Sequence, residues 1–212
     1  MKLLKTVTLS LAALAMTASV SMADTLDDTK KKGYLSCGLN TGLPGFAAPD
    51  TDGVWKGIDV DFCKAVAAAV LGDASKVKYA HLNAKERFTA LQSGEIDVLS
   101  RNTTWTATRD TSLGLNFIGA NYYDGQGFMV KKDLGVKSAK ELDGAAFCIQ
   151  AGTTTELNLT DYFKANNMAY TPITYDTTAQ TIEGFKAGRC DVITSDASQL
   201  YALRTKLCNC FT

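Results

Sequence analysis

The chain is poor in histidine, proline and tryptophan. Among 212 residues it has one histidine, His81, with three prolines and two tryptophans. His81 is far in sequence from every cysteine, and a Cys-x-Cys pair alone is a poor ligand set, so neither a metal site nor a cofactor is predicted. Neither sign of charge is in excess, because 22 lysines and arginines balance 22 aspartates and glutamates. That balance disfavours nucleic acid as a partner.

The N-terminal stretch 1–23 is typical of a secretory signal peptide. Lys2 and Lys5 precede an apolar run over 7–20, and small residues end at Ala23. A membrane anchor is the alternative, but the run is short for the roughly 20 residues that a spanning helix needs. No cysteine stands at the predicted cleavage site, so lipid attachment has no support there. Cleavage would leave 20 basic and 22 acidic residues, a net charge of about −2.

Six cysteines in an exported chain favour disulfides. Six cysteines allow 15 connectivities, and sequence alone does not choose among them. We predict pairing within each half of the chain, with buried free thiols as the alternative. The predicted pairs are Cys37 with Cys63 and Cys148 with Cys190, and the partners of Cys208 and Cys210 stay open.

A pattern of helix, short apolar strand and polar loop occurs twice. The stretch 94–104 follows a helix-like segment and contains Ile96-Asp97-Val98-Leu99, and a similar stretch covers 188–196. In each, a glycine suited to end a helix comes before the strand. Open α/β sheets bind ligands at the loops that follow such strands.

Strands and helices of this kind alternate along the whole chain, which predicts a parallel α/β sheet. The predicted strands are 34–39, 76–80, 96–99, 145–150, 170–174 and 191–194. The predicted helices are 58–71, 84–92, 138–142, 154–164, 182–186 and 197–207. We place a signal peptide at 1–23, a first lobe at 24–128 and a second lobe at 129–212, with the boundary near 125–132.

Two aspartates, Asp59 and Asp61, lie near the start of the predicted helix 58–71. A carboxylate is stabilised by the positive end of a helix, so dipole and capping roles are favoured. A catalytic pair of carboxylates is the alternative.

Four loops follow predicted strands: 40–46, 100–109, 152–156 and 194–198. A ligand held between the lobes would meet Arg101 and Arg109 on one side and Asp196 on the other. A guanidinium matches a carboxylate and a carboxylate matches an ammonium group, so this set suits an amino-acid zwitterion. The remaining hydrogen-bonding groups are predicted to come from Asn102, Thr104, Thr153 and Thr154. The alternative is that Arg109 and Asp110 form a surface ion pair and that the threonines merely begin helices.

These residues resemble the family 3 solute-binding proteins, the polar amino-acid-binding proteins of ABC importers. The segment Gly57-Ile58-Asp59-Val60-Asp61-Phe62, followed by Val66-Ala67 and Val70, matches the family signature. The stretches 87–94 and 152–157 look most like general L-amino-acid-binding proteins of broad-range bacterial permeases.

The resemblance implies roles for single residues. Arg109 would bind the ligand α-carboxylate with Thr104 and Thr154, while Asp196 and the backbone of Asn102 would bind the α-ammonium group.

Three further positions bear on ligand choice. Asn40 falls where related proteins often carry an aspartate that reads a cationic side chain, so a broader ligand range is expected. Leu43 falls near the position of an aromatic lid in some relatives, and leucine cannot supply that aromatic contact to the ligand. Arg101 adds positive charge that would favour acidic or amide side chains, unless it points to solvent.

The resemblance also implies the type II periplasmic-binding-protein fold, with two lobes that close on the ligand. Family members return from the second lobe to the first, whereas this sequence stops at Thr212, so we expect the second lobe and the C-terminal return to be incomplete. An open sheet edge there would favour aggregation.

The function implied is that of a periplasmic binding protein, not an enzyme. It would capture L-amino acids and deliver them, as a monomer, to an inner-membrane ABC permease. The alternatives are a periplasmic dehydratase on the same fold, for which His81 is the only histidine base, and a sensory domain, for which no signalling module follows.

Overall fold

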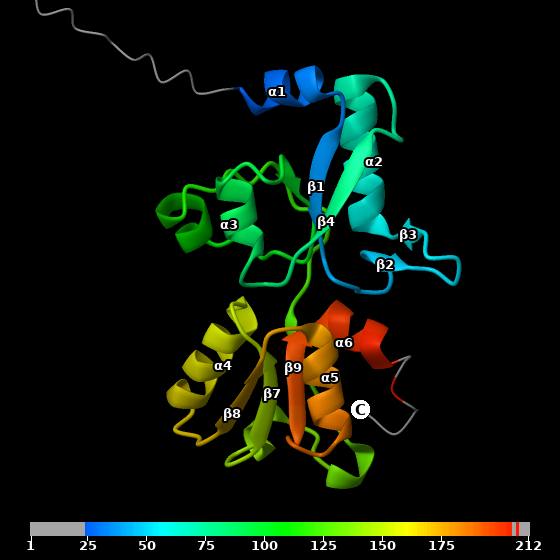
Figure 1. Cartoon of the computed structure of the whole chain (residues 1–212). Helices are drawn as coiled ribbons and strands as arrows, with labels where there is room; N and C mark the ends of the chain where they lie inside the picture. The colour runs from blue at the N-terminus through cyan, green and yellow to red at the C-terminus, as the bar shows by residue number, and fades with distance from the viewer. Residues whose placement is uncertain (1–23, 205–206, 208–212) are drawn as a thin grey trace, which may run out of the picture.

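The computed structural model describes residues 24–204 and Leu207, which form two α/β lobes (Figure 1). The first lobe has a parallel sheet in the order β4-β1-β5 and a small antiparallel hairpin, β2-β3. Its strands are β1 (Leu35–Leu39), β2 (Ala48–Pro49), β3 (Trp55–Lys56), β4 (Val77–His81) and β5 (Val98–Leu99). Its helices are α1 (Thr25–Lys32), α2 (Ile58–Leu71) and α3 (Arg87–Gln92), followed by a π-helical turn over Thr108–Ser112.

The second lobe is built on a four-stranded sheet in the order β6-β9-β7-β8. Its strands are β6 (Gln126–Val130), β7 (Ala146–Gln150), β8 (Thr171–Tyr175) and β9 (Val192–Asp196). Its helices are α4 (Thr154–Ala165), α5 (Thr178–Lys186) and α6 (Ala197–Arg204), with 3-10 turns at Lys132–Leu134 and Ala139–Glu141. The predicted two-lobed α/β fold is confirmed.

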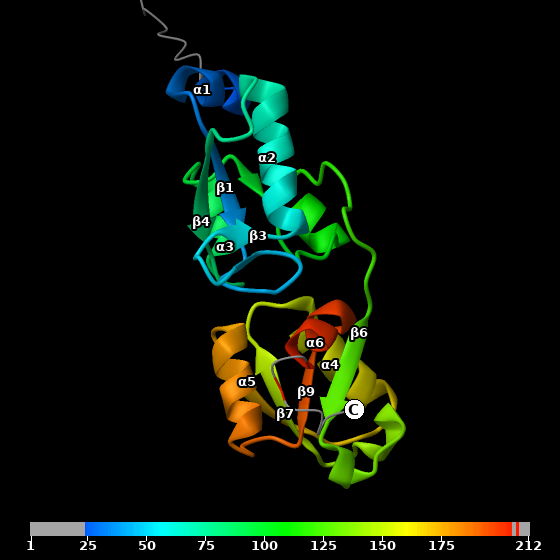
Figure 2. The same ribbon diagram turned by 90° about the vertical axis from the view of Figure 1, so that its right-hand side faces the viewer.

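Strand β6 corrects the prediction of a parallel sheet in the second lobe. It pairs antiparallel with β9 along its whole length, from Gln126 with Asp196 to Val130 with Val192, so the second sheet is mixed rather than parallel. The strand lies within the predicted boundary region 125–132. Figure 2 shows the chain descending from the first lobe into β6.

Local hydrogen bonds explain where several helices begin and end. Helix α2 stops at Gly72, whose φ of 71° is left-handed as the predicted glycine stop requires. Helix α3 begins at Arg87 rather than at Ala84, because the Asn83 side chain accepts from the backbone amides of Lys85 and Glu86 and holds a turn there. The described part of the last helix ends at Arg204.

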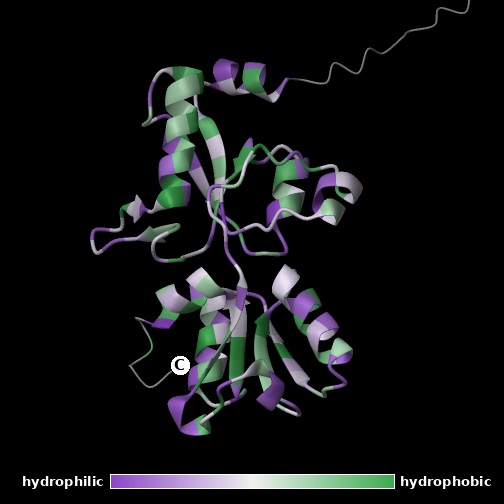
Figure 3. Ribbon diagram, turned by 180° about the vertical axis from the view of Figure 1, so that it is seen from behind, coloured by the Kyte–Doolittle hydropathy of each residue, from purple (hydrophilic) through white to green (hydrophobic). Residues whose placement is uncertain are grey.

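Each lobe has its own apolar core and its own disulfide. Figure 3 shows hydrophobic residues along the strands of both sheets and along α2. In the first lobe Cys37 of β1 is bonded to Cys63 of α2, and in the second Cys148 of β7 is bonded to Cys190, just before β9. Both predicted pairs are confirmed. The predicted signal peptide at 1–23, Cys208 and Cys210 lie outside the described residues.

A search of the described residues finds no helix that combines the length and apolar character needed to cross a membrane.

Candidate functional site

The two lobes meet where β5 and β9 end, and the predicted site residues lie at this junction. The loop 100–104 follows β5 in the first lobe, and α6 continues directly from β9 in the second. The N-terminus of α4, at Thr154, faces the same junction, because its hydroxyl lies 3.1 Å from the Thr104 hydroxyl across the lobes. The polar loops that the sequence suggested are therefore brought together.

Arg109 is buried in the π-helical turn of the first lobe, with 7% of its surface exposed. Its Nη1 donates to the Thr104 carbonyl oxygen at 2.7 Å, and its guanidinium lies 5.1 Å from the centroid of the Phe88 ring. Burial lowers the pKa of Arg109, and the charge of Asp196 opposes that shift. The alternative of a surface pair with Asp110 is wrong: Asp110 instead accepts from Trp105 Nε1 at 3.2 Å.

Asp196 supplies negative charge from the second lobe, at the end of β9. Burial raises the pKa of its carboxyl, while the hydrogen bond from Asn102 and the nearby arginines act to lower it. The bond from Asn102 Nδ2 to Asp196 Oδ2 is 3.1 Å long and crosses between the lobes.

Asn102 is the centre of the polar network at the junction. Its Nδ2 donates to Asp196 and also to Gln199 Oε1 at 3.0 Å, and its Oδ1 accepts from Asn40 Nδ2 at 2.8 Å and from Arg101 Nη2 at 3.1 Å. Its backbone carbonyl, predicted to bind an ammonium group, accepts from Arg87 Nη1 at 3.2 Å. The side chain of Asn102 is therefore more involved at this junction than the sequence suggested.

Arg101 does not point to solvent, which settles the alternative left open by its sequence position. It is buried, and its Nη1 donates to the Leu82 carbonyl oxygen at 2.8 Å. Burial lowers the pKa of Arg101 to about 10, although Asp59 and Asp196 act to raise it. Asn40 lies behind Asn102 and lines neither of the two cavities described below.

Thr153 has a structural role at the start of α4. Its hydroxyl donates to the Gln150 carbonyl oxygen at 2.8 Å and accepts from the Glu156 backbone amide at 3.4 Å, so it caps the helix. Thr153 also lines the junction, so capping and ligand contact are compatible at this position.

Arg87 is the main site residue that sequence analysis missed. It is 2% exposed, its Nη2 donates across the lobes to the Gly152 carbonyl oxygen at 3.3 Å, and its Nε has no hydrogen-bond partner. Burial lowers its pKa to about 8, with a further contribution from Arg101 and Arg109. The sequence carried no signal for this role, because the predicted helix begins at residue 84 and places Arg87 within its first turns.

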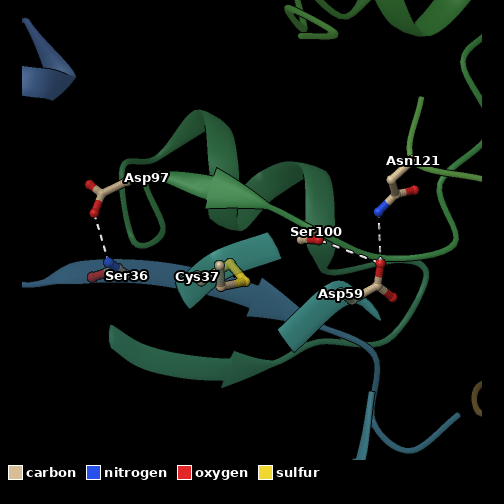
Figure 4. Close-up of a disulfide and its surroundings, with 7 residues drawn as sticks. Ser36, Cys37, Asp59, Asp97, Ser100 and Asn121 are labelled. Atoms are coloured by element: carbon tan, nitrogen blue, oxygen red, sulfur yellow. Dashed lines mark hydrogen bonds between the residues drawn. A yellow bond between two sulfur atoms is a disulfide. The ribbon is translucent and has the colours of Figure 1, made fainter. Parts of the chain in front are cut away.

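Asp59 and Asp61 do not form a catalytic pair. Asp59 is buried and accepts from Ser100 Oγ at 3.4 Å and Asn121 Nδ2 at 3.2 Å, close to the first disulfide (Figure 4). The Asp61 side chain is exposed and lies 3.8 Å from Lys64. Residues two apart on a helix point in different directions, which separates the two carboxylates. Burial raises the pKa of Asp59.

Two cavities adjoin at the junction. The smaller has a volume of about 10 Å³, enough for about one water molecule. Its lining contains Arg87, Arg101, Asn102, Thr104, Arg109, Gln150, Thr153, Thr154, Thr155, Ser195, Asp196 and Gln199. The larger has a volume of about 680 Å³ and extends into the first lobe. It shares Arg101, Asn102, Thr104, Thr154, Thr155 and Asp196 with the smaller one. An amino acid therefore needs the lobes to separate before it can enter between Arg109 and Asp196.

The fold and the site together define a two-lobed α/β protein with a charged junction between its lobes. The family of bacterial extracellular solute-binding proteins, family 3, matches residues 35–168, and the chain belongs to this family. The resemblance seen in the sequence is thereby confirmed.

Named relatives match nearly the whole chain. It is 65% identical over 198 residues to the general L-amino acid-binding periplasmic protein AapJ of Rhizobium johnstonii, covering 93% of this chain and 58% of the relative. It is 60% identical over 200 residues to the glutamate/glutamine/aspartate/asparagine-binding protein BztA of Rhodobacter capsulatus, covering 94% and 59%. The chain thus spans less than two thirds of these relatives.

A solved structure agrees in fold. The periplasmic binding protein of a Brucella ovis ABC transporter, with glutathione bound, has a TM-score of 0.85 and 57% sequence identity, over 90% of this chain and 60% of that one. These relatives are solute-binding components of transporters, not enzymes.

Proposed function

We propose that this chain is the periplasmic solute-binding component of an ABC importer and that it captures L-amino acids. The observation that carries the proposal is the placement of Arg109 and Asp196, which come from different lobes and line the same small cavity. A guanidinium and a carboxylate in this arrangement complement the α-carboxylate and α-ammonium groups of one amino acid. The names of AapJ and BztA support the same ligand class.

The ligand side chain is proposed to be acidic or to carry an amide, within a broad range. Arg87 and Arg101 add two buried guanidinium groups beside Arg109, and both are lowered in pKa by burial. After a zwitterion has paired with Arg109 and Asp196, Asp59 is left to balance Arg87 and Arg101. A second carboxylate or an amide oxygen on the ligand reduces the remaining excess of positive charge.

Capture is proposed to work by hinge motion, with no bond made or broken. The lobes separate, the ligand enters, and closure brings Asp196 back to the lobe that holds Arg109. The closed form, a monomer, then delivers the ligand to the inner-membrane permease. The dehydratase alternative gains no support from His81, which stacks on Trp55 with ring centroids 3.7 Å apart and lines neither cavity.

Isothermal titration calorimetry with glutamate, glutamine and a neutral amino acid tests the proposal. Arg109→Ala removes charge-assisted hydrogen bonds to the α-carboxylate, so we expect binding to weaken about 10–100-fold for every ligand that the chain binds. Arg189→Ala, at an exposed arginine of the second lobe, is the matched control and should bind as the wild type does. Undiminished binding by Arg109→Ala would overturn the carboxylate assignment.

A further inference from the structure

We propose that the side-chain amide of Asn102 competes with the ligand's α-ammonium group for Asp196, and that it thereby sets the resting closure of the lobes and the rate of ligand capture. The part that concerns the ligand rests on the proposed function. The part that concerns closure rests on contacts within the chain alone.

The direction of the amide is fixed by its neighbours. Arg101 only donates hydrogen bonds, so the oxygen of Asn102 must face it, and the oxygen also accepts from Asn40. The amide nitrogen consequently points across the junction, where Asp196 and Gln199 accept its two hydrogens at 3.1 Å and 3.0 Å. The first lobe holds the amide by its oxygen, and the second lobe holds it by its nitrogen.

The acceptors on the second lobe are those that an ammonium group would use. An amide nitrogen and an α-ammonium group both donate hydrogens to a carboxylate, and the amide already does so at Asp196 Oδ2. Asn102 and Asp196 also border the cavity of about 680 Å³, but the space that Arg109 shares with Asp196 is only about 10 Å³ and is too small for an amino acid. A ligand that bridges Arg109 and Asp196 therefore has to part the lobes, and with them Asn102 from Asp196.

The exchange favours the ligand. The amide is neutral, whereas an α-ammonium group carries a full positive charge and attracts the Asp196 carboxylate as an opposite ion in addition to donating hydrogen bonds. The amide thus acts as a weak internal substitute that holds the lobes together and gives way to a stronger partner. The contact between Asn102 and Asp196 slows ligand association and lowers the apparent affinity, because only molecules with the amide displaced are competent to bind.

The ion pair between Lys85 and Asp176 across the junction is a weaker holder of closure. Lys85 Nζ lies 2.6 Å from Asp176 Oδ1, but the two side chains are 56% and 62% exposed, and exposed ion pairs contribute little. The contacts of Asn102, by contrast, are made among buried residues, since Gln199 is 3% exposed and Asn40 is 2% exposed.

Small-angle X-ray scattering of the ligand-free protein tests the closure part. Asn102→Ala removes the bridge, and Gln199→Ala removes one of its two acceptors while leaving Asn102 in place. We expect a larger radius of gyration for Asn102→Ala, a smaller increase for Gln199→Ala, and no change for the control Lys85→Ala. Circular dichroism checks that each variant is folded.

Stopped-flow association with L-glutamate and L-glutamine tests the competition part. We expect Asn102→Ala to bind about threefold faster or more, because a larger fraction of the molecules is competent to bind. Folded Asn102→Ala with the scattering curve of the wild type would overturn the proposal, and so would unchanged or slower association together with wild-type binding. If the wild type binds no amino acid, the proposed function fails, while the scattering result still decides the role of Asn102 in closure.

Discussion

Gly152 faces the first lobe at the junction, and replacing it with alanine tests both backbone strain and crowding there. Its φ is +74°, a left-handed conformation, and an added Cβ would lie 3.3 Å from Lys85 Cγ and 3.4 Å from the Ala84 carbonyl oxygen of the other lobe. The left-handed conformation costs a residue with a Cβ about 1–2 kcal/mol. Gly152→Ala should therefore lower the free energy of unfolding by about that amount, which is roughly 2–8 °C in Tm for a chain of this size.

Crowding adds a second effect, confined to the closed form. The Lys85 side chain can move by a few tenths of an ångström, but the Ala84 backbone resists, so closure should become less favourable by about 1 kcal/mol or less. Such a penalty weakens ligand binding up to about fivefold.

Gly144→Ala is the matched control. Gly144 has a φ of +78° with nothing within 4 Å of an added Cβ, so it carries the strain without the contact. Thermal unfolding and calorimetry on both variants separate the two effects. We expect similar losses in Tm and weaker binding only for Gly152→Ala. Equal affinities in the two folded variants would refute the reasoning that Gly152 allows close approach of the lobes.

Two other predictions concern stability. Because burial raises the pKa of Asp59, the folded state binds its proton more tightly than the unfolded state does, and stability is lost as the pH rises from about 3.8 through the raised pKa. In thermal melts, the Tm of Asp59→Asn should be at least that of the wild type at pH 7, and the difference in Tm should disappear near pH 3. A difference in Tm that grows on acidification would contradict this. The Cys148–Cys190 bond closes a loop with a sequence separation of 42, so the double variant Cys148→Ala/Cys190→Ala should lose about 2–4 kcal/mol in urea unfolding, and an unchanged midpoint and slope would contradict it.

The elements that sequence analysis located well are those with strong local signals. Gly72 ends α2 where a left-handed stop was expected, and the alternation of strands and helices predicted two α/β lobes. The expectation that cysteines pair within each half of the chain predicted both disulfides. The antiparallel strand β6 was not anticipated in a sheet predicted to be parallel, because an apolar strand looks the same in parallel and antiparallel pairing. Only its tertiary partner, β9, determines its direction.

In the candidate site, too, some residues could be predicted from local sequence signals and others depend on tertiary contacts. The loops that carry Arg109 and Asp196 follow predicted strands, so their meeting at one junction could be anticipated from topology. Arg87 was missed because an arginine in a predicted helix is usually exposed, whereas here the approach of Gly152 from the other lobe buries it. The proposed displacement of the Asn102 amide from Asp196 could not be predicted from the sequence either, because it depends on side-chain directions that no sequence pattern specifies.

The central claim is that Arg109 holds the α-carboxylate of an amino acid between the two lobes. The most direct measurement is the coupling between that residue and that group, obtained by calorimetry on wild type and Arg109→Ala with glutamate and with 4-aminobutyrate, its analogue without the α-carboxylate. We predict that removing both the arginine and the carboxylate costs much less than the sum of the two separate losses, with a coupling of about 1.5–3 kcal/mol. Strictly additive losses in proteins that remain folded and bind glutamate would contradict the claim.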